Sequence, residues 1–586
     1  MPASSGRPFA PIEDLRPIAR RALVTHRALF TVGETVILDR WLTLPYPPAA
    51  LYARLWSRRD RLFRLSTLQY AEVDDIAGAA RILIESGFAH DGQALGSREQ
   101  WISAHPVSHL RAVCRTLELP TSGRREVLRS RLLTADARVH LAEPGLLLRH
   151  RGLFTRLCRL YLRDPEGSLE RVTCTRLGLI RYPAFQLTAE PLFRRRADLL
   201  HFETALEARN RQETPLTPQD LDAVLMRIES TPTAHGRPRR CTGRHHDERM
   251  ACLRARELER GNHLPEAARA YRRLLDAGAQ PRPWIAHRLA LVHAKQGSPE
   301  DGAALCAGML PLVSASWAQQ LQRTGRRLAH RARIGWRPLP PLRSAMERQV
   351  PLVSSGTIGH RPAYRSSAGP QVIELAVRDL LERMGRTVLA GEASPWTTLF
   401  GLLLRPALLS PVPGALPTPY LSGPLDLGTP DFFVRRRALI LEILDQVRAG
   451  QAPSILHQRF HSHHGERLWG VHWNRYDLEQ LSALAQAAGP SALARVLEIM
   501  ARGGTEALRG LPDLCVLPGP AIRVPDSLPS TLPSQLLLVE IKGPGDQLSD
   551  AQRTWNDRLL TAGVAVETWR IQARENSPDD GSRAVG

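Results

Sequence analysis

The stretch "LLLVEIKGPGDQLSDAQ", residues 536–552, joins an apolar run to a turn and then to the start of a helix. The run through Ile541 predicts a strand, and "GPGD" predicts a turn. In a strand, residues i and i+2 share a face, so Glu540 and Lys542 project together. Two charges on one face of an otherwise apolar strand are costly unless they face a cleft or a partner. The stretch therefore predicts a polar site.

Lys542 is one of two lysines in the chain. The sequence holds 79 Lys and Arg residues, and only Lys295 and Lys542 are lysines. Such a bias is typical of a GC-rich genome, and chance alone could place a lysine at position 542. The alternative is a site that needs a compact ammonium group rather than a larger, planar guanidinium. We favour the alternative, because Glu540 stands two residues earlier.

The C-terminal part of the chain predicts a β-β-α-β order. Asp513 in "GLPDLCVLPG" precedes a short apolar strand, and "AVETWRI" predicts the last strand. The helix between them, "LSDAQRTWNDRLLTAGV", has Ser549 as its cap and carries Gln552 on one face. This order indicates a mixed sheet with a flanking helix, in which Asp513 converges on Glu540 and Lys542.

Two carboxylates and an amine form the pattern PD-(D/E)xK, here Pro512-Asp513 and then Glu540-x-Lys542. Carboxylate oxygens bind hard divalent cations. Such a cation acidifies water and stabilises charge on a phosphoryl oxygen, and a neighbouring ammonium orients the water or neutralises the transition state. The pattern predicts metal-dependent hydrolysis of phosphodiesters.

The charge of the chain indicates a polyanionic partner. Its 586 residues carry a formal net charge of +21, which favours nucleic acid or an anionic membrane surface. The membrane alternative lacks support, because no apolar run is long enough to span a bilayer and the N-terminus lacks the apolar core of a signal peptide. Seven scattered cysteines without C-x-x-C spacing argue against disulfides and structural zinc. We expect a cytoplasmic protein.

Two helical modules precede the C-terminal part. Residues 105–133 predict two helices joined at "PTSG", with Arg124 and Arg125 at the start of the second, and resemble the DNA-binding SAP module. A plain helical hairpin with solvated arginines is the alternative. Pro-Glu pairs at 265–266 and 299–300 repeat with the 34-residue period of tetratricopeptide-type hairpins. Arginines such as Arg282 and Arg288 form either a solvated face or a track for a phosphate backbone; we favour the track.

The expected fold class is α+β with several domains: a mostly helical body followed by a mixed-sheet nuclease domain of the PD-(D/E)xK type. The expected boundaries are a helical region at 1–100, the SAP-like module at 101–140, a mixed region at 141–247, helical repeats at 248–345 and the nuclease domain at 346–575, with its catalytic core at 455–572.

The string "GLPDL … LVEIKGPGDQLSDAQRTWNDRLLTAG" closely resembles the virus-type replication-repair nuclease (VRR-NUC) domain. The segments "VIELAVRDLLERMG … GEASPWTTLFGLLL" (372–404) and "GLIRYPAF" (178–185) stand in the order found in the Fanconi anaemia-associated nuclease family, and "RLFRLSTLQYAEVDD" (61–75) looks like its bacterial branch. The resemblance covers nearly the whole chain.

The resemblance implies site residues. Glu392, Asp513, Glu540 and the backbone carbonyl of Ile541 would bind Mg2+ or Mn2+. Lys542 would be the catalytic lysine, and Gln552 stands at the family's helix glutamine. Around Glu392 the chain departs from the family's His-Gly-Glu-Gly-like string, because it has Ala390 and Ala393. Candidates for the basic pocket that holds a 5′-phosphate are Arg282 and Arg288.

The resemblance also implies a function. Family members are structure-specific DNA nucleases that cut near 5′ flaps, trim DNA from 5′ to 3′ and act in interstrand crosslink repair. The implied partner is branched or flapped DNA with a 5′-phosphate end, and no protein partner can be identified. A catalytically silent DNA-binding scaffold and an RNA-directed nuclease are the alternatives. A bacterial protein, associated with the nucleoid during repair, is expected.

Overall fold

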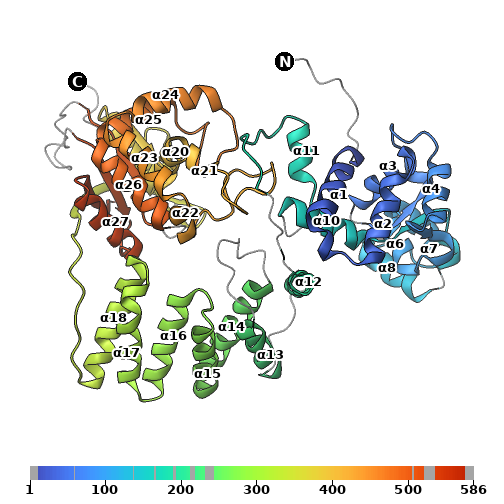
Figure 1. Ribbon diagram of the computed structural model, residues 1–586, viewed down its shortest axis with the longest axis horizontal. Coiled ribbons are helices and arrows are strands. Elements are labelled where there is room, and N and C mark those ends of the chain that lie inside the picture. The colour runs from blue at the N-terminus through green and yellow to red at the C-terminus, as the bar shows by residue number, and fades with distance from the viewer. Residues whose placement is uncertain are drawn as a thin grey trace. The chain divides into compact units, whose positions relative to one another are not determined.

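The computed structural model describes residues 11–574, except 59, 136, 164–166, 189–192, 194, 211–217, 231–242, 504–506 and 520–534. The chain divides into two compact units (Figure 1). The first comprises Met1–Ile180 and Ala189–His201, and the second comprises Arg181–Thr188 and Phe202–Gly586. Within the described ranges, no helix has the length and apolarity that a membrane crossing requires.

The first unit is a helical body with one small sheet. Edge-to-face packing of Trp41 on Phe154, with ring centroids 5.0 Å apart, lies in its core. Strands β1 (Leu62–Arg64), β3 (Gly145–Leu148) and β2 (Ala89–Asp91) form an antiparallel sheet in this spatial order. Sequence reasoning saw only helices before residue 100, because strands of three residues are too short to show an alternating pattern.

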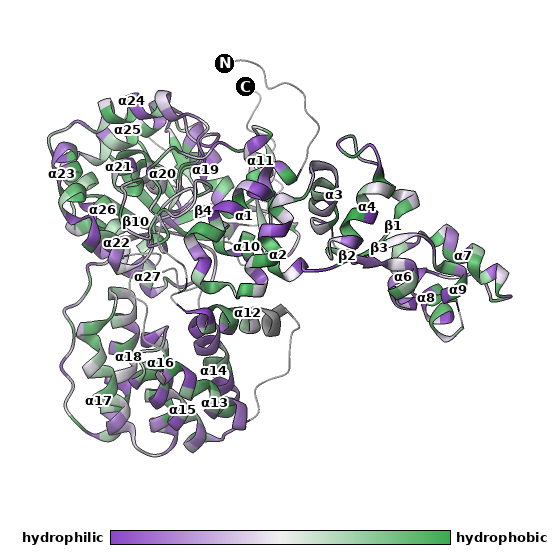
Figure 2. Ribbon diagram, turned by 45° about the vertical axis from the view of Figure 1, so that its right-hand side comes forward, coloured by the Kyte–Doolittle hydropathy of each residue, from purple (hydrophilic) through white to green (hydrophobic). Residues whose placement is uncertain are grey.

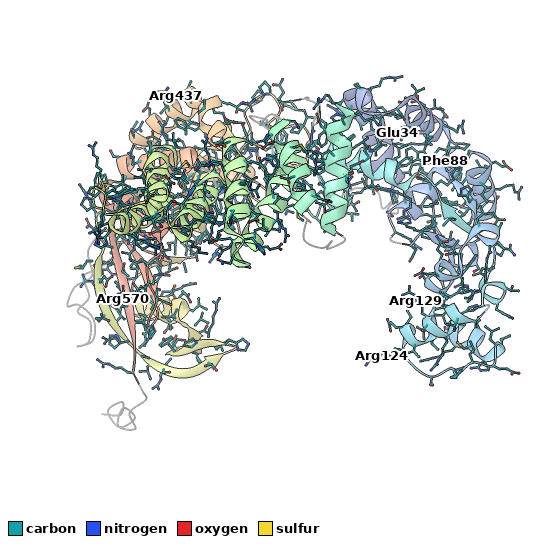
Figure 3. The ribbon with its side chains drawn as sticks, turned by 90° about the horizontal axis from the view of Figure 1, so that it is seen from below. Glu34, Phe88, Arg124, Arg129, Arg437 and Arg570 are labelled. Atoms are coloured by element: carbon teal, nitrogen blue, oxygen red, sulfur yellow. The ribbon has the colours of Figure 1, made fainter. Side chains whose placement is uncertain are left out.

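The segment that resembles a SAP module forms two helices, α7 (Val107–Thr116) and α8 (Arg125–Thr134), which pack through Leu110, Leu128 and Leu132. Figure 3 shows Arg124 and Arg129 at this helical pair. The first unit also contains α1 (Ile12–His26), α2 (Val32–Thr43), α3 (Tyr46–Trp56), α4 (Ile76–Glu85), α5 (Gly92–Leu95), α6 (Arg98–Ala104), α9 (Arg138–Leu141), α10 (Arg151–Leu162) and α11 (Glu170–Arg176).

The second unit begins with successive helical hairpins. Each helix packs on the next one along the chain (Figure 1), and the apolar faces of the hairpins contribute Tyr271, Leu289 and Leu328 to one core (Figure 2). The two Pro-Glu pairs lie in the first turns of α15 and α17, as the repeat predicts. The helices are α13 (Pro218–Ser230), α14 (Gly243–Arg260), α15 (Leu264–Asp276), α16 (Arg282–Lys295), α17 (Pro299–Met309) and α18 (Ala315–Ala332), after α12 (Arg196–Asn210).

A seven-stranded mixed sheet organises the rest of the second unit. Its spatial order is β6-β5-β4-β10-β9-β8-β7, and β10 is parallel to both β4 and β9. The predicted β-β-α-β order is confirmed as β8, β9, α27 and β10. The strands are β4 (Met346–Ile358), β5 (Arg361–Ser366), β6 (Gly369–Val372), β7 (Val388–Ala390), β8 (Leu514–Val516), β9 (Leu537–Lys542) and β10 (Ala565–Arg574).

Strand β9 separates two hydrophobic cores. Val539 and Ile541 pack into the core that includes α19 (Ile373–Arg383), whereas Leu538 packs into the larger core on the other face. Glu540 shares the face of Leu538, as the two-residue period of a strand requires. Helices around the larger core include α20 (Ser394–Leu403), α21 (Arg405–Leu408), α22 (Pro430–Arg435), α23 (Arg437–Arg448), α24 (Ala452–His463), α25 (Leu478–Ala488), α26 (Pro490–Gly503) and α27 (Asp550–Thr561).

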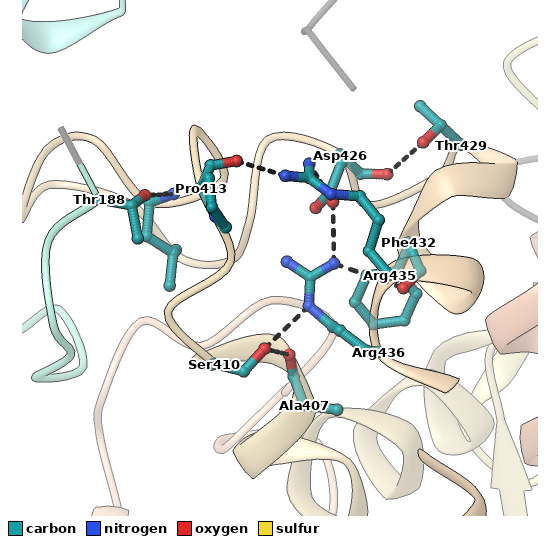
Figure 4. Close-up of polar contacts among 10 residues, drawn as sticks. Thr188, Ala407, Ser410, Pro413, Asp426, Thr429, Phe432, Arg435 and Arg436 are labelled. Carbon is teal, nitrogen blue, oxygen red and sulfur yellow. Dashed lines mark hydrogen bonds and ion pairs between the residues drawn. The ribbon is translucent and has the colours of Figure 1, made fainter. Parts of the chain in front are cut away.

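The connection between α21 and α22 contains a fully buried ion pair (Figure 4). Asp426 Oδ2 accepts hydrogen bonds from Arg436 Nη1 (2.8 Å) and Arg435 Nη1 (3.3 Å), and Arg436 Nε donates to Ser410 Oγ (3.0 Å). The side chains of Asp426 and Arg436 have no exposed surface. Without Asp426, the positive charge of Arg436 would be buried with no opposite charge beside it, which is unfavourable. The pair therefore holds the chain segments that carry the two residues together.

Replacing Asp426 by Ala should lower the free energy of unfolding by about 3–5 kcal/mol, because it leaves the Arg436 charge buried and unpaired. Denaturant unfolding of the full chain measures the loss. The control is Asp445→Ala, which removes a carboxylate that is 72% exposed and pairs with Arg448; its effect should stay below about 1 kcal/mol. Equal effects of the two substitutions would mean that the buried pair does not stabilise this connection.

Candidate active site

Asp513 and Glu540 stand opposite each other on neighbouring strands. Strands β8 and β9 are antiparallel, with Leu514 opposite Val539, so the same register places Asp513 opposite Glu540. Asp513 Oδ2 accepts a hydrogen bond from the backbone N–H of Ile541 (2.8 Å). No second hydrogen bond to the Asp513 carboxylate is formed by the described residues, which leaves its Oδ1 available to a ligand.

Glu540 is 1% exposed, and two side chains contact it at one oxygen. Lys542 Nζ lies 2.9 Å from Glu540 Oε1, and the amide of Gln552 donates to the same oxygen. Among the described parts of the chain, nothing donates to the second oxygen, Oε2. The predicted convergence of Asp513, Glu540, Lys542 and Gln552 is therefore present, and each carboxylate keeps one oxygen without a hydrogen bond.

The cap of helix α27 orients Gln552. Ser549 is the N-cap and Gln552 the third helical residue of a capping box, so Ser549 Oγ accepts from the Gln552 backbone N–H. In return, the Gln552 side-chain oxygen accepts from the Ser549 backbone N–H (2.8 Å). Because this contact uses the amide oxygen, the amide NH2 group is directed at Glu540. The capping box that begins helix α27 therefore also positions the side chain of Gln552 at the site.

The two acids have raised pKa values. Burial raises the pKa of Asp513 to about 6, and the charges of Glu392 and Glu374 add to the rise against the lowering effects of the Ile541 N–H and Lys542. Burial, together with the charges of Asp513 and Glu392, raises the pKa of Glu540 to about 8 against the lowering effect of Lys542. One ammonium does not offset this concentration of carboxylates, so the site favours an added positive charge.

Glu392 lies at the edge of this site. Its backbone N–H and that of Gly391 both bond the carbonyl oxygen of Asp513 (3.3 and 3.1 Å), and its φ of +48° is left-handed. The Glu392 side chain is exposed, and the described residues contain no group of three or more His, Cys, Asp or Glu side chains arranged to hold a metal ion. The backbone contact nevertheless places Glu392 beside the two buried acids.

Glu374 is a site residue that sequence reasoning missed. It lies in the first turn of α19, and its charge raises the pKa of Asp513. An acid in the first turn of a helix is ordinary, because it complements the helix dipole, so no local signal marked this position. The side chain of Ile541, by contrast, packs into the opposite core, and its backbone N–H rather than its side chain faces Asp513.

The arginines that were predicted to bind nucleic acid have different surroundings. Arg124 is the exposed N-cap residue of α8. Arg125 Nη2 donates to the carbonyl oxygens of Ile102, Ser103 and His105, so it caps the end of helix α6. Of the two, Arg124 has the exposed guanidinium.

Within the helical repeats, Arg282 is exposed at the start of α16. Arg288 forms two hydrogen bonds with Glu259, whose side chain is fully buried and also contacts Arg256 and Lys295. Burial raises the pKa of Glu259, but the hydrogen bonds from these three cations outweigh it and lower the pKa to about 2. Arg288 therefore stabilises the hairpins through a permanent ion pair.

In the absence of divalent metal, replacing Glu540 by Gln should raise the free energy of unfolding. This gain should grow as the pH rises from about 5 to 8. The folded-state pKa of about 8 exceeds the ordinary value, so the folded state holds the proton more tightly and loses stability as the proton dissociates. We expect a gain of about 1–3 kcal/mol at pH 8 and little gain at pH 4. Thermal unfolding in chelator measures it; a variant that is less stable than the wild type at pH 8 would contradict the raised pKa.

Comparisons with known proteins agree with this geometry. Residues 447–572 match the VRR-NUC domain, residues 14–90 match the domain described as "FAN1, HTH domain", and residues 106–137 match the SAP domain. The VRR-NUC match includes β8, β9, α27 and most of β10, and the SAP match includes both α7 and α8. VRR-NUC domains are typically metal-dependent nuclease domains.

Relatives match over most of the chain. A Fanconi-associated nuclease 1 homolog of Arabidopsis thaliana is 27% identical over 93% of this chain and 65% of its own length. A homolog of the same name from Pseudomonas aeruginosa is 25% identical over 96% of each chain. The chain thus spans about two-thirds of the plant relative.

A solved structure shares the fold. The crystal structure of paFAN1 bound to 5′-flap DNA with a gap has a TM-score of 0.80 and covers 98% of this chain and 100% of its own, at 22% identity. The domain matches, the relatives along most of the chain and the PD-(D/E)xK geometry agree: this chain is similar along nearly its whole length to the Fanconi-associated nuclease family.

Proposed function

We propose that the protein is a structure-specific DNA nuclease, with 5′-flap endonuclease and 5′-to-3′ exonuclease activity, which acts in DNA repair including interstrand crosslink repair. The observation that carries the proposal is the convergence of Asp513, Glu540 and Lys542, with one oxygen of each carboxylate free of hydrogen bonds. A silent scaffold would have no need for a buried and a half-buried acid of raised pKa side by side.

The residues fit a Mg2+ or Mn2+ ion. Asp513 and Glu540 offer hard oxygen ligands, and Glu392 and the backbone carbonyl of Ile541 would complete the set. When bound, the ion lowers the pKa of water and offsets charge on phosphoryl oxygens. The raised pKa values of the two acids support this assignment, because a cation would stabilise the charge that the pocket leaves uncompensated.

Of the other groups, Lys542 would act on the substrate directly, and Gln552 and the Ile541 backbone position the two acids. Lys542, 12% exposed and paired with Glu540, would donate to a phosphate oxygen or orient the attacking water. Gln552 holds Glu540 in one rotamer through its amide, so that the free oxygen keeps its direction. The backbone N–H of Ile541 fixes Asp513 in the same way. The result is in-line hydrolysis that leaves a 5′-phosphate product.

The substrate proposal rests on charge and on relatives. A net charge of +21 favours a nucleic-acid partner, and the related structure contains 5′-flap DNA. We propose branched or flapped DNA with a 5′-phosphate as the substrate. The second candidate function is an RNA-directed nuclease, which the positive charge of the chain also allows. The Pseudomonas aeruginosa homolog, which matches over 96% of each chain, supports a bacterial cytoplasm as the place of action.

A hollow between the start of α18 and helix α27 is a candidate for the 5′-phosphate end. It is a small, open hollow with a cavity volume of about 30 Å3, and its lining includes the hydroxyl residues Ser314 and Ser316 and the cations Arg509 and Arg558. Because it also borders Ala551, next to Gln552, it lies close to the cutting site along α27. Arg509 and Arg558 are thus further candidates for the phosphate end, beside Arg282 and Arg288.

The two lysines allow a matched test of the site. Lys542→Arg should reduce flap cleavage with Mn2+ at least about 100-fold, since a larger planar cation does not replace a compact ammonium beside a bound ion. Lys295→Arg, at a side chain that is 50% exposed in the helical repeats, should leave cleavage within about twofold. Cleavage that is unchanged in Lys542→Arg and in Asp513→Ala would remove the proposed site.

Substrate choice is tested with the wild-type protein on 5′-flap DNA, single-stranded DNA and RNA of matched sequence, each with Mn2+ or chelator. We expect metal-dependent cleavage of flap DNA close to the junction. Cleavage of RNA without cleavage of flap DNA would favour the RNA-directed alternative, and binding of DNA without cleavage of any substrate would favour the scaffold.

A further inference from the structure

Arg475 lies against the loop that carries Glu392. It belongs to the connection between α24 and α25, and its guanidinium packs on Gly391: a Cβ built at this glycine would lie 2.3 Å from Arg475 Nη2 and 2.5 Å from its Cζ. Gly391 also has a φ of +127°, so both its backbone conformation and its missing side chain permit this contact. The guanidinium therefore touches the loop whose N–H groups hold Asp513.

The connection that carries Arg475 is held on both sides. The Tyr476 hydroxyl donates to the carbonyl oxygen of Ala390 (2.6 Å), the last residue of β7. Trp473 Nε1 donates to a backbone carbonyl within the same connection (2.6 Å), and Asp477 caps α25 with a capping box. The neighbours of Arg475 thus fix the backbone from which its guanidinium reaches Gly391.

The guanidinium of Arg475 has no carboxylate partner among the described residues. It lies over the Tyr476 ring, 5.7 Å from the centroid, its only hydrogen bond to these residues is a long one from Nη1 to Ser394 Oγ (3.3 Å), and no carboxylate of theirs lies within 4.0 Å of it. A guanidinium has five N–H donors, so most are unused. Ser394 begins helix α20, and the positive end of a helix offers no compensation to a cation.

We propose that Arg475 is a further substrate-contacting residue, which binds a non-bridging oxygen of one phosphate in the DNA strand held at Asp513 and Glu540. This inference rests on the proposed nuclease function. A guanidinium matches phosphate geometrically, and a phosphate supplies the negative charge that the loop lacks. The acidic site repels a polyanion, so a fixed cation at its edge offsets that repulsion. Lys542 cannot serve this purpose alone, because its Nζ is already in contact with Glu540 Oε1 (2.9 Å).

The first test measures binding of the full-length protein to 5′-flap DNA in chelator, where no cleavage occurs. Arg475→Ala and Arg475→Gln should weaken binding about 3- to 30-fold and lower the slope of log K against log salt by about 1, and Arg475→Lys should recover part of the loss. The matched control is Arg437→Ala, an exposed arginine at the start of α23 (Figure 3), which should bind like the wild type. Unchanged binding of both Arg475 variants would overturn the proposal.

The second test places a neutral methylphosphonate at single phosphates around the cleavage position. At one position it should weaken binding by the wild type but not by Arg475→Ala, because the partner of the guanidinium is already absent. An additive loss at every position would show that Arg475 acts only on the fold and would overturn the contact. Wild-type cleavage that is abolished in Asp513→Ala tests the nuclease assignment separately, so the two proposals can fail independently.

Discussion

The antiparallel pairing of β8 with β9 is the constraint on which the chemistry of this protein depends. It places Asp513 opposite Glu540, and the two hydrophobic cores on either side of the sheet hold that register. A slip of one residue would turn Glu540 toward the apolar face and Val539 toward the site. The cores thus hold two carboxylates together that would otherwise repel each other, and this unfavourable arrangement is the basis of the proposed cation site.

The two lysines show what distinguishes a structural carboxylate from a reactive one. Both contact a buried glutamate at Oε1: Lys542 contacts Glu540 at 2.9 Å and Lys295 contacts Glu259 at 3.1 Å. Glu259 has a pKa lowered to about 2, because contacts with cations outweigh its burial. Glu540 has a pKa raised to about 8 by burial and by nearby acids. The excess of positive charge around Glu259 keeps it ionised as an ion-pair partner, whereas the excess of negative charge around Glu540 favours the binding of a further cation.

The local features of this protein could be predicted from sequence, and the non-local ones required the structure. The alternation at Val539, Glu540 and Ile541, the cap at Ser549 and the 34-residue repeat are short-range patterns, and the structure has all of them. The parallel pairing of β4 with β10 joins residues more than 200 positions apart, and no short pattern encodes it. The roles of Arg125 as a helix cap and of Arg288 as an ion-pair partner could not be predicted either, because the partners of both arginines come from other helices.

Anomalous diffraction from a crystal of the protein with Mn2+ and 5′-flap DNA would show directly whether the paired acids bind a metal ion at the cut strand. We expect a manganese peak within about 2.0–2.3 Å of the free oxygens, Asp513 Oδ1 and Glu540 Oε2, with Lys542 Nζ facing the phosphate of the cut strand. A peak bound by neither carboxylate, or DNA whose phosphates stay away from these two strands, would contradict the metal-dependent nuclease site.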